Sequence, residues 1–128
     1  MNQPSKYLYL NFRDEFYRIN IDRIAYFEAD GNYTNIVLTN KQKGVVGMNL
    51  AQMQKLLSES LKADANRFAR VGKRFIVNLN YVYHIEVLKQ RLTITDGGAA
   101  AFSLPVSKDA LKKLKEMYIS PLAAKSAE

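Results

Sequence analysis

Residues 24–39 have the sequence IAYFEADGNYTNIVLT. Two segments rich in aromatic and β-branched residues, Ile24 to Ala29 and Tyr33 to Thr39, flank the tripeptide Asp30-Gly31-Asn32. Segments of this composition favour strands, and an Asp-Gly pair between them supplies the positive φ that a tight turn needs. The stretch therefore predicts a β-hairpin in which Gly31 and Asn32 are turn residues.

Similar segments surround this hairpin on both sides. The residues of Tyr7 to Phe12 alternate between two faces, and the pattern resumes at Phe16 after Asp14-Glu15. Near the end of the chain, Asp96-Gly97-Gly98 is a second turn signal between two strand-like segments. We expect further strands at Tyr7 to Phe12, Phe16 to Ile21, Gly44 to Met48, Phe75 to Val77, Tyr81 to Leu88, Leu92 to Thr95 and Ala101 to Val106.

Two segments instead have the period of about 3.6 residues that is typical of helices. Asn49 is a good N-cap, and Gln52 three residues later brings it close to a capping box. Ser107 is the expected N-cap of the second helix, which we expect Pro121 to end. The sequence therefore predicts helices from Asn49 to Leu61 and from Ser107 to Tyr118.

Together these elements predict one mainly β domain of antiparallel sheets, with one helix in the middle and one at the C-terminus. A chain of 128 residues is long enough to bury one sizeable core and too short for two independent domains. We expect an N-terminal tail over residues 1–6, the domain over residues 7–118, and a C-terminal tail over residues 119–128.

The composition excludes several classes of site. The chain has no cysteine and one histidine, so neither disulfides, thiolate metal sites nor a multi-histidine site can form within one chain. No cofactor and no metal are expected. No apolar run approaches the roughly 20 residues that span a bilayer, so we expect no membrane partner and a cytoplasmic location. The formal net charge of +7 favours a polyanionic partner, although charge alone is weak evidence.

A search for catalytic groups finds no nucleophile with a base and no carboxylate pair. His84 and Glu86 lie on one strand face, as in the zinc deaminase signature, but the cysteines of that signature are absent. Gly97-Gly98 does not open a helix after a strand, so it cannot hold a phosphate as a P-loop does. We therefore expect no enzymatic activity.

Four cations without an intervening acid, Arg67, Arg70, Lys73 and Arg74, precede the strand at Phe75. Gly72 among them indicates a turn or bulge that lifts the cations off the sheet, where backbone phosphates would be natural partners. A solvated basic loop that only keeps the protein soluble is an equally good interpretation of these residues. On the last helix, Ser107 and Lys108 are placed to offer donors to a phosphate or a base edge.

Several ordered motifs resemble one known family. They are Ile24 to Tyr33 with the sequence IAYFEADGNY, the helix near Leu50 to Leu57, the pairs of segments FARV and FIVN at Phe68 to Val71 and Phe75 to Asn78, and LPVS at Leu104 to Ser107. In this order and spacing the motifs are far more specific than any single one. Over residues 7–118 the chain resembles the LytTR DNA-binding domain of bacterial transcription and response regulators.

The resemblance implies a stack of small antiparallel sheets whose loops enter successive major grooves of double-stranded DNA. Family members usually bind imperfect direct repeats in promoters, so two copies would pair on one face of the duplex as a homodimer. Three base-reading sites carry over by position. They are Thr34 with Asn35 beside it, Lys73 flanked by Arg70 and Arg74, and Ser107 with Lys108.

Two other functions fit parts of the sequence. A protein-interaction module could bind a peptide or an acidic partner by strand addition or by charge. An RNA-binding domain would need paired aromatic residues exposed on a sheet face. Thr34 also has a second interpretation, because threonine is common in strands for reasons of packing alone. A strong preference for one duplex sequence would distinguish a DNA reader from a module that binds by charge.

Overall fold

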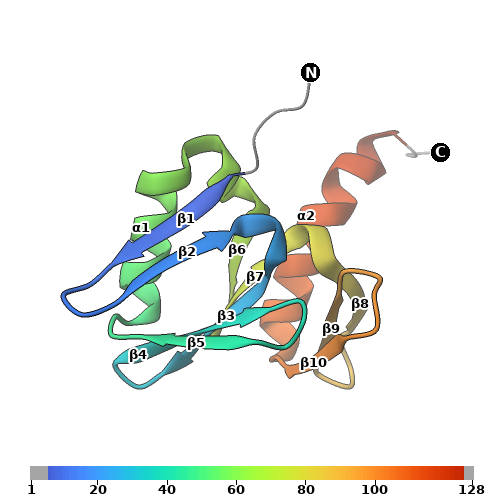
Figure 1. The fold of residues 1–128 in the computed structure, drawn as a ribbon. Coiled ribbons are helices and arrows are strands. Elements are labelled where there is room, and N and C mark those ends of the chain that lie inside the picture. Colours follow the sequence, from blue (N-terminus) through green and yellow to red (C-terminus); the bar gives the residue numbers. More distant parts are fainter. Residues whose placement is uncertain (1–5, 126–128) are drawn as a thin grey trace.

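The computed structural model describes residues 6–125 and contains three antiparallel sheets and two helices (Figure 1). This confirms the predicted mainly β fold with one helix in the middle and one at the C-terminus. The strands are β1 (Tyr7–Asn11), β2 (Phe16–Asn20), β3 (Ile24–Asp30), β4 (Tyr33–Leu38), β5 (Lys43–Val46), β6 (Phe68–Val71), β7 (Phe75–Asn78), β8 (Val82–Glu86), β9 (Arg91–Thr95) and β10 (Ala101–Pro105). The helices are α1 (Leu50–Leu61) and α2 (Lys108–Lys125).

The central sheet has five strands in the order β5-β4-β3-β7-β6. The predicted hairpin forms β3 and β4, and Gly31 takes a φ of 61° at its turn, which favours glycine. Strand β7 pairs with β3 through the register of Glu28 with Phe75, although these residues are far apart in the sequence. The other two sheets are the β1–β2 hairpin and a meander of β8, β9 and β10.

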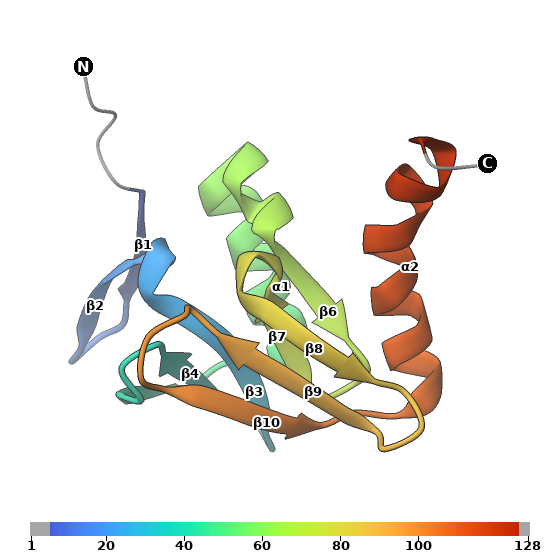
Figure 2. The same ribbon diagram turned by 90° about the vertical axis from the view of Figure 1, so that its right-hand side faces the viewer.

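The five-stranded sheet separates two hydrophobic cores, because neighbouring residues of a strand point to opposite faces. On one face Phe27 and Ile36 pack with Leu8 of β1 and with the apolar stripe of α1. On the other face Tyr26 and Val37 pack with β9, β10 and α2. Figures 1 and 2 show α1 and the β1–β2 hairpin on one side of the sheet and the meander with α2 on the other.

The start of α1 has the predicted capping box. The Asn49 side chain accepts a hydrogen bond from the Gln52 amide at 2.8 Å, and the Gln52 side chain accepts one from the Asn49 amide at 2.9 Å. Such reciprocal bonds satisfy backbone donors that a helix end otherwise leaves without partners. The buried residues of α1 are Leu50, Met53, Leu57 and Leu61, which is the spacing of one helix face.

The predicted end of α2 is wrong. The helix continues through Pro121 to Lys125, well past Tyr118. A proline removes one helical hydrogen-bond donor and often bends a helix, but it does not require the helix to stop there. Part of the predicted C-terminal tail is therefore helical, while residues 1–5 and 126–128 of the two predicted tails lie outside the described residues.

Asn78, at the end of β7, links the central sheet to the segment that follows. Its side chain is fully buried, and its Nδ2 donates to the Ile24 carbonyl at 2.9 Å. Its Oδ1 accepts from the Asn80 amide at 3.0 Å and so fixes the turn that leads into β8. Asn78 therefore has a structural role, because both ends of its side-chain amide are used to hold backbone groups in place.

Candidate nucleic-acid interface

The basic segment predicted from the sequence forms the turn between β6 and β7. Val71 pairs with Phe75 across this turn, so Gly72, Lys73 and Arg74 form a three-residue loop at the end of the hairpin. Gly72 has a φ of 64°, a left-handed conformation that an L residue with a Cβ adopts only at a cost. This conformation turns the chain sharply, and the two cations that follow are exposed.

The start of α2 lies against this turn (Figure 2). Ser107 caps the helix as predicted, with its Oγ accepting from the Ala110 amide at 3.2 Å. Leu111 and Leu114 are buried in the second core and hold the first turns of α2 on the meander and on β6. A Cβ on Gly72 would lie 3.6 Å from the Ala110 Cβ, which is ordinary van der Waals contact.

Between the β6–β7 turn and the start of α2 is an open groove of about 630 Å³. It brings together the predicted residues Arg70, Lys73, Arg74 and Ser107, which come from segments more than thirty residues apart. Lys108 does not line the groove, but it is exposed as the first residue of α2. We call this space the basic groove; it is lined by Arg70, Val71, Gly72, Lys73, Arg74, Phe75, Pro105, Val106, Ser107, Asp109, Ala110 and Lys113.

The two arginines of the basic groove are held by neighbouring acceptors. Arg74 forms an ion pair with Glu28 of β3 at 2.5 Å. Arg70 donates to the side chain of Gln54 on α1 at 3.2 Å and to the Lys73 carbonyl at 3.0 Å. No hydrogen bond or ion pair of the Lys73 ammonium is found within residues 6–125. Lys73 is thus the cation of this turn that is most free to meet an external acceptor.

Two predicted site residues, Thr34 and Asn35, lie in the central sheet instead of on a loop facing solvent. Thr34 is fully buried, and its hydroxyl donates to the Met48 carbonyl at 2.8 Å. Asn35 is 8% exposed and pairs with Glu28 across the β3–β4 hairpin. Burial removes the Thr34 hydroxyl from any base edge in this conformation. The alternative interpretation of Thr34, as a strand residue chosen for packing, agrees with the structure.

Sequence reasoning missed several residues that line the basic groove or contact its arginines. Glu28 reaches Arg74 only because β7 pairs with β3, a long-range contact that the sequence pattern does not reveal. The contact of Gln54 with Arg70 could not be predicted from the sequence either, because it depends on how α1 packs on the sheet. Asp109 and Lys113 could have been found, because residues four apart share one face of a helix that begins at Ser107.

A tyrosine near this site has a shifted pKa. Burial raises the pKa of Tyr26, and the nearby Glu28 carboxylate raises it further. The Tyr26 ring packs edge to face against Phe75, the residue that follows Arg74. Tyr26 therefore stays protonated at neutral pH and supports the turn by packing instead of by proton transfer.

The structure offers little for other chemistries. Residues 6–125 contain no group of three histidine, aspartate or glutamate side chains that could hold a metal ion. His84 and Glu86 lie 3.7 Å apart on β8, where His84 is exposed and Glu86 is partly buried. Within the described part of the chain, no helix is both long and apolar enough to cross a membrane.

Comparison with known proteins adds independent evidence. A family model described as the LytTr DNA-binding domain matches residues 14–119. Two heme-containing CO-sensing transcriptional regulators of Paraburkholderia xenovorans (strain LB400), RcoM 2 and RcoM 1, are 28% and 27% identical to the chain over 99 residues. These alignments cover 77% of this chain and 34% of each regulator, so the chain spans about a third of the length of these relatives.

A solved structure has the same fold. A LytTr DNA-binding domain from Bacillus cereus superposes with a TM-score of 0.61 and 20% sequence identity. The superposition covers 91% of this chain and 98% of that domain. At this level of sequence identity the likeness establishes the arrangement of sheets and helices. It does not show which residues contact DNA, so these have to be inferred from the chemistry of the groove.

Proposed function

The chain belongs to the LytTr DNA-binding domain family, and on this premise we propose that it binds double-stranded DNA sequence-specifically as part of a bacterial transcription regulator. The observation that carries the proposal is the convergence of the β6–β7 turn and the start of α2 on one basic groove. The formal net charge of +7 supports attraction to a polyanion over a longer range.

Lys73 is the proposed base-reading residue. It lies at the end of a hairpin, in a turn that the left-handed conformation of Gly72 shapes. An ammonium group can donate to O6 and N7 of guanine in the major groove. Because no protein acceptor of Lys73 is found in the described residues, binding DNA would not require an existing bond of this side chain to break.

Arg70 and Arg74 are the proposed phosphate contacts. Both are fixed by neighbouring side chains, which suits a contact that sets the position of the protein on the duplex. The Ser107 oxygen accepts a backbone bond, which leaves its hydroxyl hydrogen to donate to a phosphate. Lys108 adds an exposed cation at the same helix start. Thr34 and Asn35 are left out of the proposed contacts because of their burial.

The family resemblance also supports a proposal about the target. We propose that two copies bind imperfect direct repeats in promoters and lie on one face of the duplex. Such a pairing would double the electrostatic contacts and add the specificity of a second site without any change in the domain itself.

The proposal is tested by selecting bound duplexes from a random library. A sequence-specific domain should enrich one motif, and the preferred duplex should compete against scrambled duplex by orders of magnitude in affinity. Equal binding to all duplexes would contradict the proposal and would favour a module that recognises acidic partners by charge. A single-stranded RNA competitor in the same assay separates the RNA-binding alternative, because it would then displace the selected duplex.

A further inference from the structure

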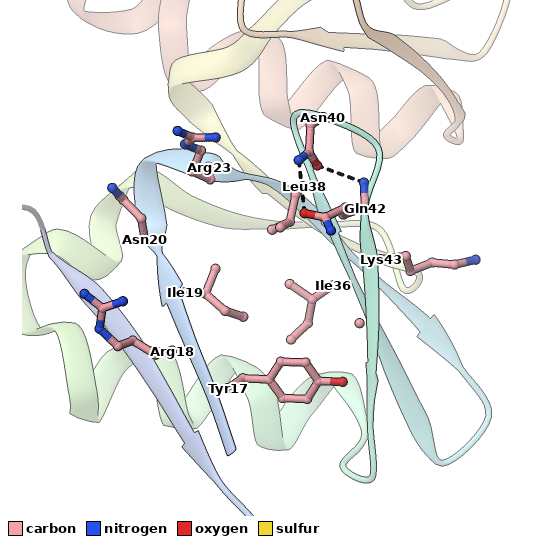
Figure 3. A pocket seen from close by; sticks show the side chains of 11 residues that line it. Tyr17, Arg18, Ile19, Asn20, Arg23, Ile36, Leu38, Asn40, Gln42 and Lys43 are labelled. Carbon is pink, nitrogen blue, oxygen red and sulfur yellow. Dashed lines mark hydrogen bonds between the residues drawn. The ribbon is translucent and has the colours of Figure 1, made fainter. Parts of the chain in front are cut away.

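A second cavity, of about 330 Å³, lies between the β1–β2 hairpin and the edge of the central sheet. No residue lines both this cavity and the basic groove. Figure 3 shows the side chains of Tyr17, Ile19 and Ile36 around a common space, with Leu38 beside them. These side chains come from β2 and β4, so the space belongs to the seam between two separate sheets.

The cavity follows from how the two sheets meet. Strand β2 pairs with β1 and β5 pairs with β4, and β2 and β5 do not pair with each other. The Tyr17 ring packs over Gly44 of β5, where a Cβ would come within 3.2 Å of the ring. This contact holds the hairpin against the sheet at one point, and the seam beside it contains the cavity.

The rim of the cavity is polar and positively charged. Its lining includes Arg18, Arg23 and Lys43 together with three side-chain amides, and it contains no carboxylate. No ion pair of these three cations occurs within residues 6–125. Arg18 stacks over the Tyr7 ring at 4.0 Å, and Lys43 points away from the cavity in Figure 3. Both side chains are exposed and add positive charge near the rim.

We propose that this cavity binds a small organic anion with an aromatic or branched aliphatic body. The body would lie between Ile19, Ile36 and Tyr17, and the acidic group would lie at the rim near Arg23. The volume lies at the low end of the roughly 300 to 1,000 Å³ that is typical of sites for small organic ligands. A nucleic-acid phosphate fits the charge of the rim but leaves the apolar interior empty, which is why the structure favours a compact amphipathic ligand.

The test uses the full chain labelled with ¹⁵N, without DNA, and three naphthalene probes that differ in charge. Naphthalene-1-sulfonate should shift the amide signals of β2 and of the β4–β5 turn, with saturation. Neutral 1-naphthalenemethanol should bind more weakly, and cationic 1-naphthylmethylammonium should bind weakest. Because this readout needs no duplex, failure of the cavity proposal is distinguishable from failure of the proposed DNA binding.

Two variants of the lining and one control variant test whether binding occurs in the cavity. Gln42→Glu adds a carboxylate to the lining and keeps the oxygen that accepts from Asn40, so sulfonate binding should weaken about fivefold. Asn32→Asp makes the same charge change at an exposed turn that does not line the cavity, and it should leave binding unchanged. Ile19→Phe fills the space and should abolish binding while the rest of the spectrum keeps its folded dispersion.

Three outcomes would overturn the proposal. The first is an absence of saturable shifts with the sulfonate up to its solubility limit. The second is equal affinity for all three probes, which would show an apolar seam without charge selectivity. The third is a set of shifts confined to the β6–β7 turn and the start of α2, which would place the anion in the basic groove.

Discussion

Single residues of the basic groove differ in how firmly the protein holds them. Arg74 is tied to Glu28 and Arg70 to Gln54, whereas the Lys73 ammonium has no acceptor within the described residues. Exposed ion pairs contribute little to stability, so the main effect of the Glu28 contact is to orient the guanidinium. The two kinds of cation should therefore respond differently to removal.

Lys73→Ala should weaken binding to the preferred duplex by about 1 to 3 kcal/mol and relax the preference at one base pair. Arg70→Ala should weaken binding to all duplexes nearly alike, because a phosphate contact carries no base information. Competition binding on the preferred duplex and on its single-substituted versions measures both effects. An equal loss on every duplex for Lys73→Ala would make Lys73 a phosphate contact and leave base reading to other residues of the groove.

Asn78→Ala should lower the free energy of unfolding by about 2 kcal/mol. The change leaves the Ile24 carbonyl and the Asn80 amide without the partners that the buried Asn78 side chain gives them. Urea unfolding at equilibrium measures the loss. Asn11→Ala, at an exposed strand position, is the matched control and should stay within about 0.5 kcal/mol of the parent. Equal free energies of unfolding for the two variants would show that these buried hydrogen bonds do not contribute to stability.

At this scale the sequence predicted the chemistry of the site better than its exposure. Lys73 could be placed at a turn and Ser107 at a helix start because a glycine turn and an N-cap are local signals. Thr34 could not be judged in the same way from its position in the family pattern. Its alternation with Ile36, which is also buried, was the available signal that Thr34 faces α1 and the first core.

Among the elements, the β6–β7 turn depends on one backbone conformation. Gly72→Ala should destabilise the fold by about 1 kcal/mol, because the strain comes from the positive φ and not from contact with Ala110. It should also weaken DNA binding, since Lys73 follows directly. Gly47→Ala is the control, because a Cβ there meets only the Tyr33 ring at 3.9 Å. Thermal unfolding measures the loss of stability, and duplex titration measures the loss of DNA affinity. Equal stability and equal affinity for the two variants would contradict the role given to the positive φ of Gly72.

The two helices show which element boundaries local signals can predict. Asn49 and Gln52 mark the start of α1 because the capping box is formed by residues three apart. The predicted end of α2 is too early, because Pro121 does not stop this helix, which continues to Lys125. The start of a helix that has a capping box is thus easier to predict than the end of a helix that contains a proline, because a helix can continue past a proline.

For the whole molecule, the proposed DNA binding predicts a defined dependence on salt. Each phosphate contact contributes a slope of about −0.9 to a plot of log affinity against log salt concentration. Contacts from Arg70, Arg74 and Lys108 therefore predict a slope of about −2.7 for one bound copy. Titrations of the preferred duplex at several salt concentrations measure it, and a flat response would rule out the proposed phosphate contacts.

The pairing of distant strands into sheets was the feature of the fold that the sequence predicted least well. Hairpins such as β3–β4 and the β8–β10 meander follow from turns between neighbouring strands. The pairing of β3 with β7 joins segments about fifty residues apart, and no local pattern specifies it. The family resemblance supplied the stacking of sheets, and the ion pair of Glu28 with Arg74 depends on it.

Strand β3 lies between the two cores, and most of its residues are buried. The backbone amides of its inner part can exchange with solvent only when both cores open together, so they should be the slowest to exchange deuterium. The β6–β7 turn is anchored to this strand through the Arg74 carbonyl, which accepts from the Ala29 amide at 2.8 Å. Lys73 is therefore next to a residue that is bonded to this strand, and it should hold its position during transient opening of the outer strands.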